Sequence, residues 1–264
     1  MSKALLMSTL GKLVGNRPTQ RLLEFTLRVN LWLMGIGAGA APESSGESVL
    51  PRMIRRHAQG RPMCILDVGA NAGQFATMMI GALEGCDVTL HCFEPARETF
   101  AALTARLGSD PRVRLNKMAL GAQKGELPLF YDEPGSHIAS LHKRRLDFRD
   151  IEFDKSETVP VDTLDAYCSA NVPGPIDLLK LDVEGHELEV LRGALGTLPR
   201  VKMVSFEFGG SNIDSRTYLQ DFHYFFKEHG FGLLRITPSG FLVPVKYMEH
   251  MEQFSTTNYV AVRP

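Results

Sequence analysis

The chain has 264 residues, of which 44% are hydrophobic and 22% are charged, so it is long enough to bury a full core without disulfides or a structural metal. This composition excludes collagen-like, disordered and disulfide-scaffold proteins. The 29 Lys and Arg residues against 30 Asp and Glu residues leave a formal net charge of −1. Because nucleic-acid binders usually carry a strongly basic domain, we expect no nucleic-acid partner.

The cysteine pattern indicates a reducing compartment. The four cysteines, Cys64, Cys86, Cys92 and Cys168, form no CxxC pair and have no histidine cluster at zinc spacing beside them. Cys64 and Cys92 fall within apolar, strand-like runs, where a free thiol behaves as a small buried hydrophobe. We therefore expect a cytoplasmic protein.

Residues 1–41 are both basic and apolar, with five basic side chains against one acid. Their longest nearly uncharged stretch, residues 29–41, has 13 residues, whereas a membrane-spanning helix needs about 20. The run Ala38–Ala40 imitates a signal-peptidase site, but the 28 residues before the apolar run are long for the start of a signal peptide, so we expect no secretion. Two interpretations remain: a helix packed on the main domain, or a basic amphipathic helix on a membrane surface or partner.

The polar, turn-rich segment 42–48 predicts a boundary between a helical extension with its linker (1–48) and a main domain (49–264). In the main domain, continuous apolar runs alternate with helical patterns. Predicted strands cover 63–68, 88–93, 113–120, 176–181, 201–208, 231–236 and 258–262, and predicted helices cover 50–57, 74–83, 96–107, 185–195 and 215–229. A short strand at 126–131 and a charged insertion at 134–155 interrupt the alternation. The pattern predicts an α/β domain with a doubly wound, mostly parallel, seven-stranded sheet, whose ligands bind beyond the carboxyl ends of the strands.

A nucleotide site is predicted after the first two strands. Gly69 and Gly73 follow the first strand, where glycine allows positive φ and close approach of a ligand. The loop reads GxNxG through Asn71 and so departs from the GxGxxG of dinucleotide-binding proteins. Glu94 ends the second strand 21 residues after Gly73, where a carboxylate can accept hydrogen bonds from ribose hydroxyls. A purely structural turn is the alternative.

The loop favours S-adenosylmethionine over NAD as the cofactor. S-adenosylmethionine has no pyrophosphate to cradle, and Asp67 is acceptable near an ammonium group but would repel a pyrophosphate. Asn116 and Ala119, at the end of the third predicted strand, complete the predicted cofactor contacts together with Asp182.

The predicted chemical end follows the next two strands. Asp182, Glu184 and His186 come after the strand at 176–181, and Glu207 ends the next strand. A hydroxyl that reacts as a nucleophile must lose its proton, and His186 is the only side chain in its stretch that can be a neutral base near pH 7. We predict that His186 is the general base, that Asp182 orients it or the hydroxyl, and that Glu207 is also catalytic. The alternative is that Glu184 and His186 only satisfy the amides at the start of a helix.

Glu207 offers two further alternatives. It could bind substrate, or hold a divalent metal such as magnesium together with Asp182 and His186. We expect no metal in the site, because the metal is the less favoured interpretation.

Several segments resemble the FkbM family of S-adenosylmethionine-dependent methyltransferases. They are ILDVGANAGQF (65–75), FEP (93–95), ALG (119–121), VPVDTLD (159–165), LLKLDVEGHELEVLRGA (178–194) and SFEF (205–208). The resemblance runs from about residue 64 to the C-terminus, is most specific in LKLDVEGHE, and leaves out 1–60. It implies a class I (Rossmann-like) methyltransferase fold and O-methylation of a hydroxyl on a sugar or a natural product.

The insertion resembles the segment that covers the active site in this family. The resemblance implies that His137, Ser140 and His142 contact the acceptor, and we add Glu184 to these predicted substrate residues. The basic run 143–145 is either a solvated face or a clamp for a phosphate or uronate.

We therefore predict a cytoplasmic O-methyltransferase of polysaccharide biosynthesis that acts on a carbohydrate or glycolipid-type acceptor. Residues 1–41 would make peripheral contact with the inner face of a membrane. The alternatives are a polyketide or other small-molecule acceptor, methylation of a nucleic acid, a non-catalytic cofactor-binding module, and an NAD-dependent dehydrogenase.

Overall fold

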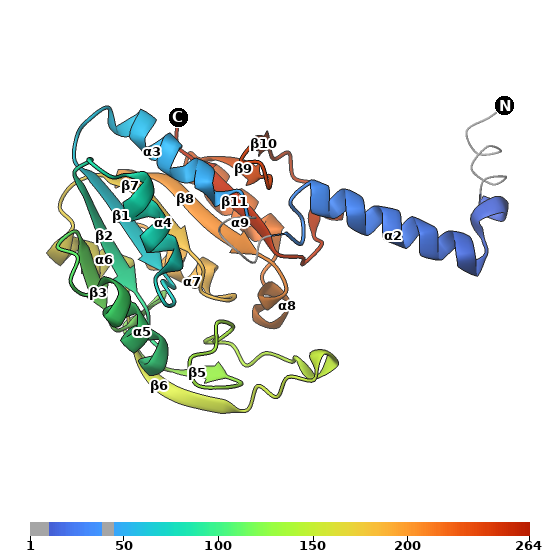
Figure 1. The fold of residues 1–264 in the computed structure, drawn as a ribbon, viewed down its shortest axis with the longest axis horizontal. Helices are drawn as coiled ribbons and strands as arrows, with labels where there is room; N and C mark the ends of the chain where they lie inside the picture. The colour runs from blue at the N-terminus through green and yellow to red at the C-terminus, as the bar shows by residue number, and fades with distance from the viewer. Residues whose placement is uncertain (1–10, 39–44) are drawn as a thin grey trace.

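The computed structural model describes residues 11–38 and 45–264 (Figure 1). Part of the predicted linker (42–44) and part of the signal-peptidase-like run (39–40) lie outside the described residues.

The described strands are β1 (Met63–Val68), β2 (Val88–Phe93), β3 (Val113–Asn116), β4 (Ala119–Leu120), β5 (Gly125–Tyr131), β6 (Lys155–Asp162), β7 (Ile176–Leu181), β8 (Val201–Phe208), β9 (Gly232–Ile236), β10 (Leu242–Pro244) and β11 (Thr257–Val262). The described α-helices are α2 (Arg17–Leu33), α3 (Leu50–Ala58), α4 (Gln74–Ala82), α5 (Arg97–Leu107), α6 (Leu164–Asn171), α7 (Glu187–Arg192), α8 (Ser211–Ser215) and α9 (Leu219–Glu228). The short 3-10 helices are η1 (Glu47–Val49), η2 (Asp147–Arg149), η3 (Leu198–Arg200) and η4 (Glu249–Met251).

The main sheet of the described chain has eight strands in the order β10-β9-β11-β8-β7-β1-β2-β3. Strands β8, β7, β1, β2 and β3 run parallel, whereas β11 is antiparallel to both of its neighbours. The chain proceeds outward from β1 to β3 and then returns to place β7 beside β1, so the strand order reverses between β1 and β7. The predicted doubly wound, mostly parallel sheet is confirmed, and the three-residue β10 adds an eighth strand at its edge.

Helices cover both faces of this sheet because alternate strand residues point to opposite sides. On one face, Ile65 and Leu178 pack in a cluster with residues of α3, α4 and α5. On the other face, Leu66 and Leu179 pack with residues of α6, α7 and α9. The continuous apolar strands that the sequence shows are therefore explained by burial on both faces.

Several predicted boundaries are wrong. The strand predicted over 113–120 ends at Asn116, and β4 instead joins a second sheet in the order β4-β6-β5. The sequence missed β6, where charged and exposed residues alternate with the buried Val159 and Val161. The helix predicted over 215–229 starts only at Leu219, because Arg216 adopts a left-handed conformation (φ 56°) that ends α8.

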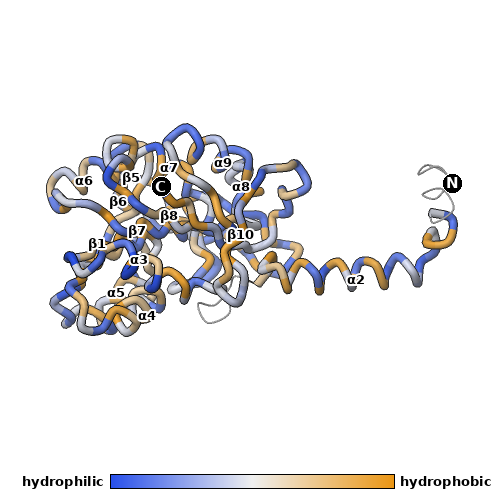
Figure 2. The backbone as a smooth tube through the Cα atoms, turned by 90° about the horizontal axis from the view of Figure 1, so that it is seen from above, coloured by the Kyte–Doolittle hydropathy of each residue, from blue (hydrophilic) through white to orange (hydrophobic). Residues whose placement is uncertain are grey.

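The helix α2 extends away from the main body of the protein (Figures 1 and 2). None of its residues is buried, so the interpretation that this helix packs on the main domain is wrong. Large hydrophobic side chains are exposed along it and just beyond its ends: Leu13, Leu22, Leu23, Phe25, Leu27, Val29, Trp32, Leu33 and Met34. Among the described residues, no helix combines the length and apolar character needed to cross a bilayer.

Candidate active site

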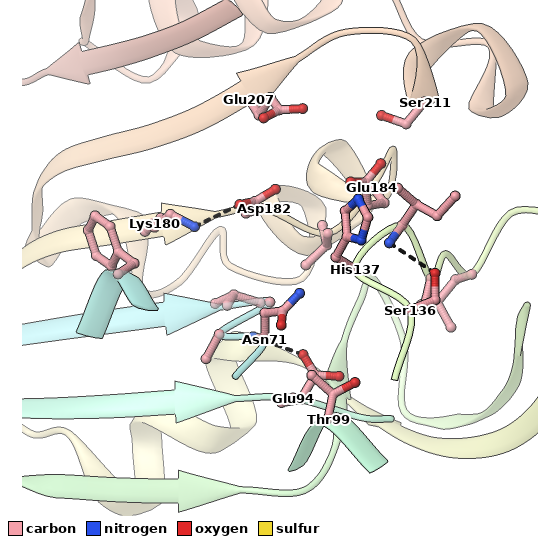
Figure 3. Close-up of a pocket in the computed structure, with 18 of the residues that line it drawn as sticks. Asn71, Glu94, Thr99, Ser136, His137, Lys180, Asp182, Glu184, Glu207 and Ser211 are labelled. Atoms are coloured by element: carbon pink, nitrogen blue, oxygen red, sulfur yellow. Dashed lines mark hydrogen bonds and ion pairs between the residues drawn. The ribbon is translucent and has the colours of Figure 1, made fainter. Parts of the chain in front are cut away.

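A cavity of about 800 Å³ lies at the carboxyl ends of the central parallel strands (Figure 3). Side chains that follow these strands line it: Glu94 after β2, Asp182 after β7 and Glu207 within the end of β8. The insertion contributes a further wall through 136–139, Leu141 and Arg144. The cavity therefore lies where the strand order reverses, as expected for a doubly wound sheet.

The loop after β1 brings the backbone close to both neighbouring strands. Gly69 has φ 82°, and a Cβ atom there would lie 1.8 Å from the carbonyl oxygen of Asp182, so only glycine fits. The backbone N–H of Gly69 donates to the carbonyl oxygen of Phe93 on β2. Asn71 also adopts a left-handed conformation (φ 49°), which asparagine tolerates better than most residues. The loop is thus held between β2 and β7 at one end of the cavity.

Glu94 and Thr99 form the part of the cavity that suits a ribose. The Glu94 carboxylate accepts hydrogen bonds from the backbone N–H groups of Asn71 (3.0 Å) and Ala96 (2.9 Å). Burial raises the pKa of Glu94 to about 7, against these two bonds, which lower it. The buried hydroxyl of Thr99 has no hydrogen-bond partner among the described residues and lines the cavity beside Glu94 (Figure 3). A carboxylate and a hydroxyl with unused hydrogen-bonding capacity fit the two hydroxyls of the nucleoside that S-adenosylmethionine contains.

Lys180 connects the acids of β1 and β7. Its Nζ lies 2.9 Å from Asp182 Oδ2, 3.9 Å from Asp67 Oδ1, and 4.9 Å from the ring centre of Phe75. Burial opposes the charged ammonium, yet Asp182, Asp67 and Glu47 together raise the pKa of Lys180 above its ordinary value. Asp67 itself is fully buried, and burial raises its pKa to about 6. Lys180 is not among the predicted site residues, although a lysine inside an apolar strand is a signal for a buried charge.

Asp182, Glu184 and Glu207 form an acidic cluster, each offering a carboxylate oxygen within 4.8 Å of the others. Burial, followed by the charge of Asp182, raises the pKa of Glu184 to about 8. Burial and the charges of Asp182 and Glu184 raise the pKa of Glu207 well above its ordinary value. Because three close carboxylates resist simultaneous ionisation, this end of the cavity can hold a proton near neutral pH.

Two basic side chains compensate part of this negative charge. Lys180 pairs with Asp182, and Arg144 Nη1 lies 2.7 Å from Glu184 Oε2. Arg144 comes from the basic run of the insertion, but its side chain is 8% exposed and turns inward, whereas Lys143 and Arg145 are exposed. The insertion is therefore attached to the acidic cluster by an ion pair.

His186 lies outside the lining of the cavity among the described residues. Its Nδ1 is 3.2 Å from His142 Nε2, and burial together with His142 lowers the pKa of His186 to about 4. Ser140 also points away from the cavity lining, since its hydroxyl donates to the backbone oxygen of Glu184 at 2.7 Å. No side chain of the described chain caps the start of α7, so neither Glu184 nor His186 satisfies its first amides, and the Glu187 carboxylate instead accepts from the backbone N–H groups of Val183 and Gly185 in the turn before the helix. The base role of His186 therefore stays a prediction. Glu207, which the sequence also predicts to be catalytic, does line the cavity.

The cavity brings together most of the predicted site residues but not all. Those that line it are Gly69, Asn71, Glu94, Ala119, His137, Asp182, Glu184 and Glu207. Those outside its lining are Asp67, Gly73, Asn116, Ser140, His142 and His186. Gly73 directly precedes α4. The side-chain amide of Asn116 donates hydrogen bonds to backbone oxygens of β2 and β3, so these two residues stabilise the elements that carry the cavity lining. Residues that we missed include Glu47, Thr99, Lys180 and Asn258.

The doubly wound sheet, the glycine loop after β1 and the acid after β2 define the class I, S-adenosylmethionine-dependent methyltransferase fold. Residues 67–233 match the model of the methyltransferase FkbM domain, and the chain belongs to this family.

Three methyltransferases are similar to this chain in sequence. The chain is 26% identical over 159 residues to 2-O-methyltransferase NoeI of Sinorhizobium fredii, covering 56% of this chain and 64% of that protein. It is 29% identical over 165 residues to hexuronic acid methyltransferase AglP of Haloferax volcanii, covering 61% and 62%. It is 30% identical over 201 residues to 31-O-demethyl-FK506 methyltransferase FkbM of Streptomyces tacrolimicus, covering 65% and 76%. The matched region thus spans less than two thirds of the length of the first two relatives.

Proposed function

We propose that this protein transfers a methyl group from S-adenosylmethionine to a hydroxyl of a carbohydrate or glycolipid-type acceptor. The observation that carries this proposal is the acidic cluster Asp182, Glu184 and Glu207 at the end of the cavity away from Glu94 (Figure 3). Carboxylates accept hydrogen bonds from the neighbouring hydroxyls that sugars present. Two of the relatives are, by name, a 2-O-methyltransferase and a hexuronic acid methyltransferase.

The cofactor would be held by the loop after β1 and by Glu94, with Thr99 as a further contact. When bound, S-adenosylmethionine supplies a methyl group on a cationic sulfonium. Ala119 also lines the cavity, and Gly73 and Asn116 support its walls. Asp67 would act through Lys180 rather than by contact, because it is fully buried and lies outside the lining.

Glu207 is our proposed general base. It accepts the hydroxyl proton while the acceptor oxygen forms its bond to the methyl carbon and the carbon–sulfur bond breaks, which leaves the methyl ether and S-adenosylhomocysteine. A carboxylate with a raised pKa is a stronger base than an ordinary one. Asp182, which accepts a hydrogen bond from the Lys180 ammonium, orients the hydroxyl. His137 and Glu184 line the same end and would contact the rest of the acceptor.

A divalent metal at the acidic cluster is the alternative to this proton transfer. The three carboxylates are close enough to hold an ion. However, Asp182 already has Lys180 as its cationic partner and Glu184 has Arg144. The two ion pairs leave one uncompensated carboxylate, a weak site for a hard cation that prefers several oxygen ligands. We therefore propose metal-independent transfer.

We further propose that the protein works in the cytoplasm, in polysaccharide biosynthesis, with residues 1–41 in peripheral contact with the inner face of a membrane. All four cysteines lie in the described chain and carry free thiols, as suits a reducing compartment. Arg17, Arg21 and Arg28 share one face of α2, and the exposed rings of Phe25 and Trp32, four residues after Arg21 and Arg28, lie beside these arginines. This pairing of arginine with exposed aromatic and aliphatic side chains complements an anionic bilayer.

The proposal is tested by incubating the purified protein with methyl-labelled S-adenosylmethionine and separate acceptors. The acceptors are uronic-acid oligosaccharides, neutral oligosaccharides, a glycolipid, a macrolide bearing a free hydroxyl, and RNA. We expect label in a carbohydrate or glycolipid as a base-stable methyl ether. Label only in the macrolide would favour the small-molecule alternative, which the FK506-directed relative supports. Cofactor binding without transfer to any acceptor would favour a non-catalytic module.

A further inference from the structure

One wall of the cavity comes from the N-terminal extension, outside the segment 67–233 that matches the family model. Glu47, the first residue of η1, lines the cavity and is 7% exposed. It belongs to the segment 42–48 that the sequence predicts to be a linker. A buried carboxylate is costly unless it is paired, and among the described residues Glu47 has a hydroxyl partner but forms no ion pair, so a cationic group of a ligand would complement it.

The backbone around Glu47 is firmly placed against the main domain. Gly46 has φ 79°, and a Cβ atom there would lie 1.9 Å from the carbonyl oxygen of Thr237. Val49 and Leu50 are buried in the core cluster formed with α4 and α5. The backbone N–H of Gly37, another residue that lines the cavity, donates to the carbonyl oxygen of Thr256 at 2.8 Å. Glu47 is therefore a built part of the cavity wall.

Glu47 and Lys180 give the cavity lining a carboxylate and an ammonium that interact electrostatically. Burial raises the pKa of Glu47, and the charge of Lys180 acts against this rise. Lys180 lines the same cavity, and among the described residues its ammonium makes one hydrogen bond, to Asp182. An ammonium has three donors, so Lys180 has donors left for a ligand. Glu47 Oε2 accepts from the hydroxyl of Ser45 at 2.9 Å and can also accept further bonds.

A carboxylate and an ammonium in the lining of one cavity are complementary to an α-amino acid group, which carries one ammonium and one carboxylate. The ribose-binding residues Glu94 and Thr99 lie after β2, whereas Lys180 belongs to β7, across β1. The two groups thus match the two ends of S-adenosylmethionine. We propose that Glu47 accepts a hydrogen bond from the α-ammonium of the cofactor, while Lys180 donates to its α-carboxylate. This inference rests on the proposed function.

Two ligands separate the contribution of Glu47 from that of the nucleoside contacts. S-adenosylhomocysteine has the amino acid group, and 5′-methylthioadenosine lacks it but keeps the nucleoside and the thioether. Their dissociation constants would be measured by calorimetry for the wild type, Glu47→Gln and Glu94→Gln. Glutamine keeps the size of Glu47 and an acceptor for Ser45, so the fold is preserved and thermal unfolding checks this.

We expect Glu47→Gln to weaken S-adenosylhomocysteine about 10- to 100-fold, the range for a hydrogen bond between charged groups, and to change 5′-methylthioadenosine less than about twofold. Glu94→Gln should weaken both ligands. Equal weakening of both ligands by Glu47→Gln would assign it a structural role and overturn the inference. No change in either would do the same. A wild type that binds neither ligand would overturn the cofactor assignment itself, a result distinct from these.

Discussion

At the scale of single residues, Glu207 is the side chain on which the proposed chemistry depends most. Replacing it with glutamine removes the proton acceptor and keeps the shape of the side chain. We predict that Glu207→Gln lowers kcat about 10²- to 10⁴-fold, the usual contribution of a general base, with little change in cofactor affinity. Initial rates at saturating cofactor, together with calorimetry, measure the two effects. The control is Glu126→Gln on the exposed part of β5. A variant at Glu207 that kept half of the wild-type kcat would contradict our proposal.

Glu184 gives a prediction for the pH dependence of the reaction. Its charge helps to raise the pKa of Glu207, so the base form of the cluster increases as the pH rises toward 8. Replacing Glu184 with glutamine removes one like charge and should lower the pKa of the remaining cluster. We expect the acidic limb of the kcat profile to move to lower pH by about one unit. The profile would be measured between pH 5 and pH 9, and an unmoved limb, or one moved upward, would show that the cluster does not govern the step.

The ion pairs of the acidic cluster predict the effect of metal removal. Lys180 and Arg144 already compensate Asp182 and Glu184, so dialysis against EDTA should leave the rate unchanged, and added magnesium should not raise it. Rates before and after dialysis provide the measurement. A loss that magnesium restores would assign the three carboxylates to a metal.

At the scale of elements, α2 provides a direct test of the membrane proposal, because Trp32 is the only tryptophan in the chain and is 56% exposed. Insertion of the exposed apolar side chains of α2 into a bilayer would move this ring from water to the interface. We predict a blue shift of the tryptophan emission when the protein is mixed with vesicles that contain phosphatidylglycerol. The shift should decrease in high salt, because salt screens the attraction between arginines and anionic lipids.

Two comparisons make this membrane test specific. Arg21→Gln with Arg28→Gln should weaken the shift while keeping every exposed apolar side chain of α2, and vesicles of phosphatidylcholine alone should give a smaller shift. A blue shift that grows with protein concentration in the absence of vesicles would instead indicate that α2 pairs with a second copy of the chain. Unchanged emission with anionic vesicles would exclude the membrane role.

At the scale of the whole molecule, buried acids with raised pKa values make stability depend on pH. Burial is the main cause of the raised values of Glu94 and Glu187, each about 7, and of Glu184, about 8. A carboxyl whose pKa is raised by folding binds more protons in the folded state, so its stabilisation is lost as the pH rises through the folded value. Buried histidines such as His186 act in the opposite direction, but only below about pH 6.5, where the unfolded chain binds their protons.

We therefore predict that the free energy of unfolding of the ligand-free protein falls between pH 6.5 and pH 8.5, on the order of 2 kcal/mol. Thermal unfolding at three pH values across this window would measure it. Glu187→Gln should flatten the fall, because glutamine keeps an acceptor for the N–H groups of Val183 and Gly185 but does not titrate. Constant or rising stability over the window would show that these acids are not held protonated.

The sequence alone predicted the parallel core of the molecule well. The strands β1, β2, β7 and β8 read as continuous apolar runs, because burial on both faces leaves no polar alternation. The second sheet was harder to predict, since β6 is largely exposed and its partner β5 lies more than 20 residues away along the chain. Its pairing is a long-range contact that local pattern does not report.

Local sequence also determined the positions of Glu94, Asp182 and Glu207, because residues that end parallel strands must meet at one edge of the sheet. Only the tertiary structure decided which neighbouring side chains reach the cavity. His186 is two residues beyond Glu184 along the chain, yet Glu184 lines the cavity and His186 packs against His142 behind it. Glu47 lines the same cavity, although its polar, turn-rich segment is predicted from the sequence to be a linker. Spacing along a strand or helix fixes local direction, whereas the packing of distant segments sets which charges are buried together.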